Sequence, residues 1–260
     1  MDIFNVLVLG IVEGFTEFLP ISSTGHMILA AKLMGLEQTE FLKTFELSVQ
    51  FAAILAVLVL YWKKLFCDKQ TFKKVVLAFI PTGIIGLFIY KFVKTYLTGN
   101  YNATIWSLLI GGILIIVFEK IFAKKDLEPQ KEIQEINAIG NKKAIVLGAC
   151  QALAGIPGVS RSATTIIAGR LMDLSKKTIV EFSFLLAIPT MAAVTIWDLK
   201  NSIAGFSMDQ INLFAWGFLF SFVFAIIGIK FLLNFVQKHS FTAFGVYRII
   251  LALVFFLFVK

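Results

Sequence analysis

Residues 9–36 read LGIVEGFTEFLPISSTGHMILAAKLMGL, and residues 147–174 read LGACQALAGIPGVSRSATTIIAGRLMDL, so the chain contains one unit twice. Leu9 aligns with Leu147 at an offset of 138 residues. Each copy has an apolar arm, a break rich in proline, serine and glycine, and a second apolar arm. Arms of about ten residues are too short to cross a bilayer as helices and are typical of re-entrant segments. We therefore expect both breaks to lie near the middle of a membrane.

The composition indicates an integral membrane protein. Hydrophobic residues make up 58% of the 260 residues, phenylalanine alone contributes 28, and only 15% are charged. A soluble domain cannot hide that much apolar surface from water. The formal net charge of +8 does not indicate nucleic-acid binding, because the lysines and arginines cluster beside apolar segments, where they set topology. The two cysteines, Cys67 and Cys150, have neither a CxxC nor a zinc spacing and predict no disulfide framework or metal site.

Each copy of the unit is followed by three longer apolar stretches, which predict transmembrane helices. They lie at 44–62, 75–97 and 103–122 in the first half and at 178–197, 211–233 and 243–259 in the second. Because three is odd, the second half must enter the membrane in the opposite orientation to the first. We expect an all-α polytopic membrane protein with two inverted-topology repeats, each a re-entrant helix-loop-helix plus three transmembrane helices.

The repeat also sets the expected domain boundaries. Residues 1–260 form a single membrane domain, in which the first inverted repeat covers 1–125 and the second covers 144–260. The polar stretch at 126–143 between them is expected to be a plain solvated linker in the cytoplasm.

Loop charge predicts the orientation, since cytoplasmic connections carry the excess of lysine and arginine. The connections at 63–74, 119–143 and 170–177 are rich in these residues, whereas those at 98–102 and 198–210 are not. The first set should face the cytoplasm. The first re-entrant unit then opens outward, the second opens toward the cytoplasm, and their tips meet in the middle.

Two carboxylates lie in the first apolar arm. Glu13 and Glu17 are four residues apart, so on a helix they share one face. Ionisable residues inside a membrane segment are rare and usually functional, although an interfacial helix with both carboxylates in water is the alternative. Paired carboxylates supply the oxygen ligands that suit Mg²⁺ or Ca²⁺. The spacing favours, without proving, a divalent-metal site.

The first break, Pro20–His26, reads PISSTGH. Proline ends the first arm, and the hydroxyls of Ser22, Ser23 and Thr24 can cap the second. Capping alone is one interpretation; the other is an anion site, because a helix start presents free N–H groups and a positive dipole end. His26 follows Ser23 by three residues, a spacing at which a base can face a hydroxyl on one helical turn. A purely structural histidine is the alternative.

The second break, PGVSRS at 157–162, repeats the pattern with Ser160, Arg161 and Ser162. An arginine in an apolar setting needs an anion, and its planar guanidinium suits phosphate. A structural carboxylate partner, such as Glu181 or Glu46, is the alternative.

Four further polar residues lie in or beside the predicted spans. Glu46 and Gln50 are four residues apart and could line the same cavity as the breaks. Together with Glu181 and Arg248, they could equally form structural pairs between helices.

These residues carry a resemblance to a known family. EGFTEFLPISSTGH at 13–26 and PGVSRS at 157–162 resemble the two signature motifs of the bacterial undecaprenyl-diphosphate phosphatases, the family associated with bacitracin resistance. The resemblance covers the whole chain in length, internal repeat and span count. It implies removal of the terminal phosphate from undecaprenyl diphosphate, the lipid carrier recycled in cell-wall synthesis, with a divalent metal at the outer face of the bacterial plasma membrane. The family's motif positions fall on Glu13, Glu17, Ser23, His26 and Arg161.

With this resemblance the chain is expected to be a membrane phosphatase whose partners are a polyprenyl diphosphate lipid and the bilayer. Glu13 and Glu17 would hold Mg²⁺ or Ca²⁺, and Arg161 would grip the diphosphate. Ser23 is the candidate nucleophile, and His26 is its base or the base for a water in direct hydrolysis. Glu17 and Arg161 complete the catalytic group. The further substrate-binding candidates are Ser22, Thr24, Ser160, Ser162 and Gln50. The oligomeric state, a homodimer included, is left open.

Two other classes of function compete with this interpretation. A secondary transporter or lipid flippase shares inverted repeats with helices broken at the midplane. It accounts for Arg161 but not for Ser23 and His26 beside two carboxylates. A membrane scaffold predicts apolar packing without ionisable residues in its short arms, which this sequence contradicts.

Overall fold

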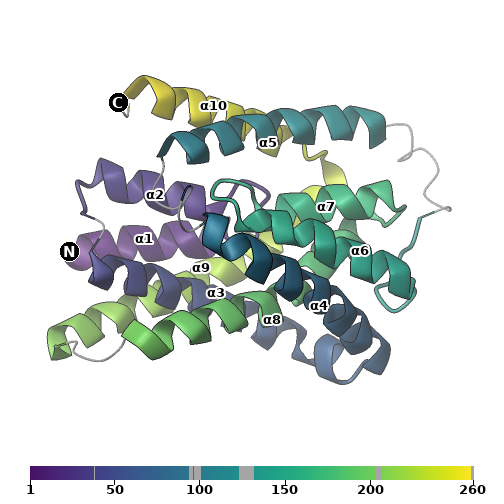
Figure 1. The fold of residues 1–260 in the computed structure, drawn as a ribbon, viewed down its shortest axis with the longest axis horizontal. Helices are drawn as coiled ribbons and strands as arrows, with labels where there is room; N and C mark the ends of the chain where they lie inside the picture. The colour runs from purple at the N-terminus through teal and green to yellow at the C-terminus, as the bar shows by residue number, and fades with distance from the viewer. Residues whose placement is uncertain (38, 94–95, 97–100, 123–131, 203–206, 259–260) are drawn as a thin grey trace.

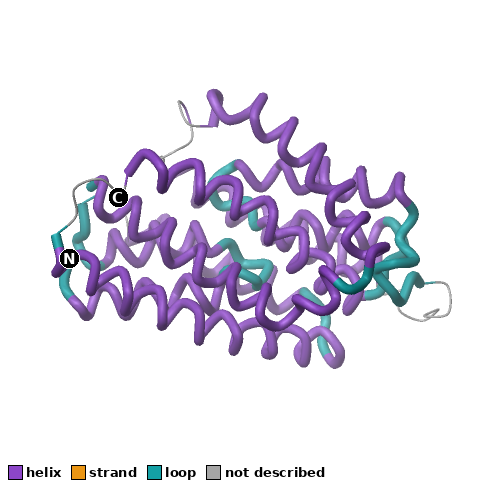
Figure 2. Tube along the Cα trace, turned by 90° about the horizontal axis from the view of Figure 1, so that it is seen from below, coloured by secondary structure: helices purple, strands orange, loops and turns teal. Residues whose placement is uncertain are grey.

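A computed structural model of the protein describes residues 1–260 except 38, 94–95, 97–100, 123–131, 203–206 and 259–260. The described part is helical, and its only β-type pairing is an isolated bridge between Ile133 and Leu174 (Figures 1 and 2). The helices are α1 (Ile3–Thr16), α2 (Ser23–Leu33), α3 (Glu40–Phe66), α4 (Lys69–Phe92), α5 (Tyr101–Phe122), α6 (Asn141–Gln151), the 3₁₀ helix η4 (Ala152–Gly155), α7 (Arg161–Leu171), α8 (Lys176–Ser202), α9 (Met208–Lys238) and α10 (Thr242–Phe258).

Five helices in the described residues are long and apolar enough to cross a membrane, namely α3, α4, α5, α8 and α9. Their outward surface is apolar, as contact with lipid requires: Leu87 and Phe88 on α4 are 79% and 83% exposed. These findings confirm a multi-pass, all-α membrane protein. The sixth predicted span corresponds to α10, which has 17 residues. At about 1.5 Å per residue it reaches roughly 25 Å, short of a roughly 30 Å hydrocarbon core, so its crossing stays a prediction.

Each half begins with two short helices separated by a break, where the sequence predicts them. Helix α1 ends at Thr16, and α2 begins after Ser22, whose hydroxyl accepts the Gly25 N–H. In the second half α7 begins after Ser160, whose hydroxyl accepts the Ala163 N–H. In both copies a serine thus caps the second helix, and a proline lies in the break between the two helices.

The two halves pack in a reciprocal manner. Helix α1 lies against α9 of the second half, and its counterpart α6 lies against α4 of the first half (Figure 1). Glycine permits both contacts, because a Cβ on Gly14 would lie 2.2 Å from the Ser221 backbone oxygen, and one on Gly148 would lie 1.8 Å from that of Ala78. This exchange of partners is expected if an internal two-fold axis relates the halves, and that relation stays a prediction. The inversion of the halves across a bilayer stays a prediction.

The lysine-rich connections gather at one end of the bundle. Lys74 donates to the Asn141 side chain at 2.7 Å, and Lys143 donates to the Met172 carbonyl at 2.6 Å. These contacts join the starts of α4 and α6 to the end of α7, as expected if all three connections face one side of the membrane.

The stretch between the halves is more than a plain solvated linker. The backbone of Ile133 accepts the Ser175 N–H and donates to the Asp173 carbonyl, and Ile136 and Ile139 are buried. Helix α6 also begins at Asn141, inside the predicted linker. The alternation of isoleucine with polar residues allowed this segment to pack onto the bundle; residues 126–131 lie outside the described part.

Candidate active site

The tips of the two breaks touch. The hydroxyls of Ser160 and Ser162 both donate to the Leu19 carbonyl, at 3.4 and 2.8 Å, and lie 2.9 Å from each other. A carbonyl at a break has lost its helical partner, so these serines satisfy a backbone group that is otherwise unpaired in a buried position. The two tips therefore meet, as predicted. Two of the predicted substrate-binding residues, Ser160 and Ser162, form the hydrogen bonds of this contact.

The carboxylate of Glu17 connects the two breaks, because it forms an ion pair with Arg161 and a hydrogen bond with Ser23. Arg161 donates from Nη2 to Glu17 Oε1 at 3.0 Å, and Ser23 donates from its hydroxyl to the other oxygen of Glu17. Arg161 also donates from Nη1 to the Ser183 carbonyl at 3.0 Å, and its guanidinium carbon lies 5.9 Å from the centre of the Phe18 ring. The guanidinium is thus fixed by α1 and α8 at the start of α7. This geometry brings together three of the predicted catalytic residues.

The alternative partners suggested for Arg161 are wrong. Glu181 forms an ion pair with Lys64 instead. Glu46 leaves a buried carboxylate oxygen without a hydrogen-bond partner. The carboxylate that Arg161 contacts is that of Glu17, at the end of the first arm, a pairing that the spacing of residues along the sequence cannot reveal.

Glu13 and Glu46 supply the carboxylate oxygens that are still free. Oε1 of each is buried without a hydrogen-bond partner, and the charges of Glu17 and, to a smaller extent, Glu46 act on Glu13. Glu17, by contrast, has both oxygens engaged by Arg161 and Ser23. Two buried, unsatisfied carboxylate oxygens suit a hard divalent cation, which commonly takes one or two carboxylates and completes its shell with water and phosphate. Among the described residues, no group of three or more histidine, cysteine or acidic side chains is arranged so that all of them could hold one metal ion.

His26 does not contact Ser23. Its Nδ1 lies 2.8 Å from the Ser22 carbonyl oxygen and its Nε2 lies 2.7 Å from the Tyr247 hydroxyl. The ring stacks on Tyr247 with 5.5 Å between centroids and 4° between planes. Ser23 and His26 share the first turn of α2, but the serine faces Glu17 and the imidazole folds back on the preceding turn. The expected hydroxyl–imidazole pair is therefore replaced by a Ser23–Glu17 pair.

The other predicted substrate-binding residues, Ser22, Thr24 and Gln50, form no hydrogen bond to Glu17 or Arg161 among the described contacts. Ser22 has a φ of 71°, in the left-handed region that side-chain-bearing residues rarely adopt, and its hydroxyl caps α2. Thr24 is exposed beside it, and Gln50 is half-buried on α3, one turn beyond Glu46. A half-buried glutamine and an exposed threonine remain free to meet a ligand.

Arg248 on α10 is a residue whose role the sequence did not reveal. It is 1% exposed and donates to four backbone carbonyls. The acceptors are Pro20 and Gly158 in the two breaks and Ser107 and Leu108 on α5. The sequence singles out Arg248 as a charged residue in an apolar helix. It does not predict the acceptors, because they are backbone carbonyls, which every residue has. Tyr247, the partner of His26, gave no signal at all.

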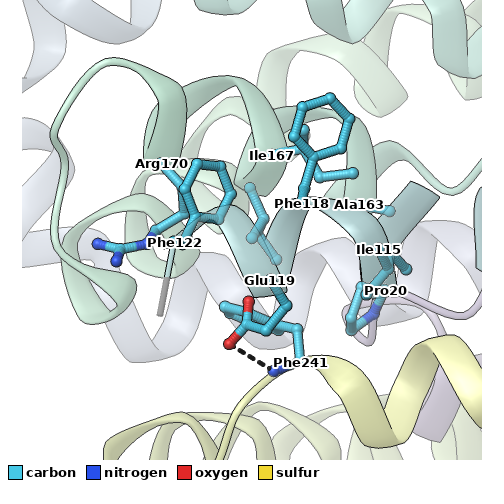
Figure 3. Close-up of a pocket in the computed structure, with 10 residues that line it drawn as sticks. Pro20, Ile115, Phe118, Glu119, Phe122, Ala163, Ile167, Arg170 and Phe241 are labelled. Atoms are coloured by element: carbon cyan, nitrogen blue, oxygen red, sulfur yellow. Dashed lines mark hydrogen bonds between the residues drawn. The ribbon is translucent and has the colours of Figure 1, made fainter. Parts of the chain in front are cut away.

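A small cavity lies beside Pro20 and α5, next to the tips (Figure 3). Its volume is about 10 Å³, room for roughly one water molecule, so it is too small for a lipid diphosphate. Its wall includes Glu119, whose carboxylate accepts the Phe241 N–H at 3.1 Å. The lining residues are Pro20, Ile115, Phe118, Glu119, Phe122, Ala163, Ile166, Ile167, Arg170 and Phe241.

Comparison with known proteins gives matches along nearly the whole chain. The family model described as bacitracin resistance protein BacA matches residues 6–254. A protein named undecaprenyl-diphosphatase from Aquifex aeolicus is 48% identical over 261 residues, which cover 99% of this chain and 100% of that protein. Proteins of the same name from Persephonella marina and Bdellovibrio bacteriovorus are each 46% identical, over 100% and 98% of this chain and 100% and 95% of theirs.

Proposed function

The chain belongs to the bacitracin resistance protein BacA family, and on that premise we propose that it is a membrane phosphatase that removes the terminal phosphate from undecaprenyl diphosphate. The relatives that carry this activity in their name match over their full or nearly full length. The observation that supports the chemistry is the convergence of Glu17, Ser23 and Arg161 at the junction of the two breaks. The candidate nucleophile, Ser23, and the candidate phosphate-binding residue, Arg161, are both hydrogen-bonded to the candidate proton acceptor, Glu17.

Arg161 is the proposed phosphate-binding residue. Its guanidinium is planar and presents several donors in a fixed geometry, which suits two oxygens of one phosphate group. Nη2 faces Glu17 and Nε is buried without a hydrogen-bond partner. A phosphate oxygen that approaches Nε satisfies this donor, and the Ser183 carbonyl keeps the guanidinium in place meanwhile.

Glu13 and Glu46 are the residues proposed to hold a divalent cation, Mg²⁺ or Ca²⁺, with Glu17 beside them. When bound, the cation neutralises charge on the diphosphate and polarises its phosphorus–oxygen bonds. The buried charges of Glu13 and Glu46 repel each other, so a cation held by these residues would also relieve an electrostatic cost of the fold. Glu46 replaces Glu17 as the second ligand in this proposal, because both oxygens of Glu17 are already engaged.

Ser23 is the proposed nucleophile and Glu17 its proton acceptor. Attack of the Ser23 oxygen on the terminal phosphorus forms a serine–phosphate ester, breaks the bond to the bridging oxygen and releases undecaprenyl phosphate. The serine proton passes to Glu17, which already accepts its hydrogen bond. Water then hydrolyses the ester, and His26 is the proposed base for that water. Direct attack by water, with Ser23 only binding the phosphate, is the alternative route to the same products.

Two measurements test this proposal. Purified protein in detergent with undecaprenyl diphosphate should release inorganic phosphate, whereas a transporter or flippase breaks no bond and releases none. Acid quenching during turnover followed by mass spectrometry should find phosphate on Ser23 if the covalent route is correct. Phosphate release without a phosphorylated Ser23 peptide would favour direct hydrolysis, and the absence of phosphate release would contradict the function.

The reaction is proposed to take place at the outer face of the membrane, where the product re-enters the lipid-carrier cycle of cell-wall synthesis. This proposal is supported by the lysine-rich connections, which gather at the end of the bundle remote from the α2–α3 connection. Under the rule that cytoplasmic loops are rich in lysine and arginine, the mouth of the first unit faces outward.

A further inference from the structure

The hydroxyl of Tyr247 contacts Nε2 of His26, the ring nitrogen that could take part in proton transfer. The two residues are 221 positions apart in the chain, and the tyrosine hydroxyl lies 2.7 Å from Nε2. The other ring nitrogen, Nδ1, lies 2.8 Å from the Ser22 carbonyl oxygen. The rings are stacked within 4° of parallel. One residue therefore governs both the tilt of the imidazole and the hydrogen bond at its second nitrogen.

These contacts allow one tautomer of the neutral imidazole. A carbonyl oxygen can only accept, so Nδ1 must carry the proton that it shares with Ser22. In the neutral ring Nε2 then holds the lone pair, and the Tyr247 hydroxyl must donate to it. Without the hydroxyl, Nε2 loses its donor, and the ring is held by the Ser22 carbonyl alone.

We propose that Tyr247 is a positioning residue for His26, which keeps the imidazole in the Nδ1–H tautomer with Nε2 ready to accept a proton. The proposal rests on the acid–base role of His26 given above. Tyr247 is 42% exposed whereas His26 is 8% exposed. The tyrosine hydroxyl can therefore yield its place at Nε2 to a water molecule or a phosphate oxygen, while the buried imidazole keeps its orientation.

The packing of α10 fixes where the tyrosine hydroxyl lies. Gly245, two residues before Tyr247, meets α5 at Gly112: a Cβ on Gly112 would lie 2.7 Å from the Gly245 carbonyl oxygen. This close approach of two backbones is available only to glycine. On the other side of Tyr247, Arg248 binds the carbonyls of Pro20 and Gly158. The helix that carries the tyrosine is thus tied to the same breaks that carry the catalytic residues.

Nuclear magnetic resonance of the imidazole nitrogens tests the tautomer directly. The chain has two histidines, so His239→Gln leaves His26 as the only imidazole signal. ¹⁵N shifts should report the Nδ1–H tautomer in this protein and a mixture of tautomers once Tyr247→Phe is added. Identical shifts with and without the tyrosine hydroxyl would overturn the proposal.

Kinetics test whether the tyrosine acts through the histidine. Tyr247→Phe keeps the stacked ring, and we expect kcat to fall on the order of tenfold, as for other partners that orient a functional imidazole, with KM within about twofold. In a His26→Gln background the same change should have no further effect. Tyr101→Phe is the control, because Tyr101 contacts Lys32 through its ring rather than its hydroxyl, and kcat should not change.

The outcomes separate this inference from the roles proposed above. If His26→Gln keeps the wild-type kcat, the acid–base role of His26 is wrong and the inference falls with it. If His26→Gln loses activity while Tyr247→Phe keeps it, the positioning role alone is wrong. A Tyr247→Phe variant that is faster than wild type would mean that the hydroxyl blocks Nε2 and would also contradict the inference.

Discussion

Glu17 links the two repeats, because one of its carboxylate oxygens binds a residue of the first repeat, Ser23, and the other binds a residue of the second repeat, Arg161. One accepts from Arg161 at 3.0 Å and the other accepts from Ser23. A buried carboxylate is stable only when it is paired and hydrogen-bonded, so Glu17 fixes the proposed nucleophile, Ser23, and the proposed phosphate-binding residue, Arg161. Glu13 and Glu46 each keep one buried oxygen without a hydrogen-bond partner, and these are the oxygens proposed to bind a cation.

Glu46→Gln should weaken the metal site. The substitution keeps the size of the side chain but removes one of the charged ligands, so the metal concentration for half-maximal phosphate release should rise at least about tenfold. The measurement is a metal titration of chelator-treated protein. Glu40→Gln is the control on the same helix, because Glu40 lies on the surface in a pair with Lys43 and should not shift the titration. Equal titrations for both variants would remove Glu46 from the metal site.

Arg161→Lys should lose at least about tenfold in kcat/KM, although the charge is kept. Each tenfold corresponds to about 1.4 kcal/mol. An ammonium group cannot reach Glu17 and the Ser183 carbonyl together in the plane that the guanidinium occupies. Steady-state kinetics of the lysine variant and wild type measure the loss in kcat/KM, and thermal melting checks that the variant is folded. A lysine variant within about twofold of wild type would show that charge alone is needed.

At the scale of elements, helix α10 holds the two breaks together through hydrogen bonds from Arg248. Arg248 satisfies one carbonyl of each break and two of α5. The guanidinium has room because of Gly111: a Cβ there would lie 2.2 Å from Nη2 and 2.7 Å from Cζ of Arg248. The charge is compensated by carbonyl dipoles, as is common for ionisable groups within membrane proteins.

Gly111→Ala should therefore disturb both stability and activity. The new methyl group has to displace a guanidinium held by four hydrogen bonds, and the loss of even one at a buried carbonyl costs about 1–3 kcal/mol. Gly83→Ala on α4 is the matched control, since nothing lies within 4 Å of its Cβ position, and it should be neutral or slightly stabilising. Thermal melting and phosphate release are measured for both. Equal melting temperatures would mean that Arg248 moves aside without cost.

The repeat predicted the elements well, and the side-chain pairs poorly. The arms, breaks and caps were predictable because proline, glycine and serine act locally, through backbone geometry and capping. The partner of Arg161 and the partner of His26 were not, because each lies more than 140 residues away, and spacing within one helix carries no information about them. Even within one helical turn the spacing did not predict the contact between Ser23 and His26 correctly, because their rotamers direct the two side chains to different partners.

At the scale of the whole molecule, the proposed active site takes residues from both copies of the repeated sequence unit, and the two copies differ in the residues they contribute. The first copy has Glu13 where the second has Gln151, whose amide contacts Thr82 on α4. The second copy instead contributes Arg161 at the tip. The reciprocal packing of α1 on α9 and α6 on α4 brings the two tips together. Neither half contains the complete set.

The orientation of the bundle can be tested with an impermeant thiol reagent in intact cells. Glu37 lies exposed in the α2–α3 connection, and native Cys67 lies exposed between α3 and α4. Glu37→Cys in a Cys67→Ser/Cys150→Ser background should be labelled in intact cells if, as proposed, the mouth of the first unit faces outward. Cys67 in a Cys150→Ser background should be labelled only after the membrane is permeabilised. The reverse pattern would invert the topology and place the reaction on the cytoplasmic side.

The most direct test of the shared site is phosphate release from undecaprenyl diphosphate by three proteins purified in the same detergent: wild type, Ser23→Ala and Arg161→Ala. The two substitutions lie in different halves of the chain but meet on the same carboxylate, Glu17. Wild type should release phosphate steadily, and each variant should be slower by about a hundredfold or more, with thermal melting showing that both remain folded. A folded variant of either residue within about tenfold of the wild-type rate would contradict the account.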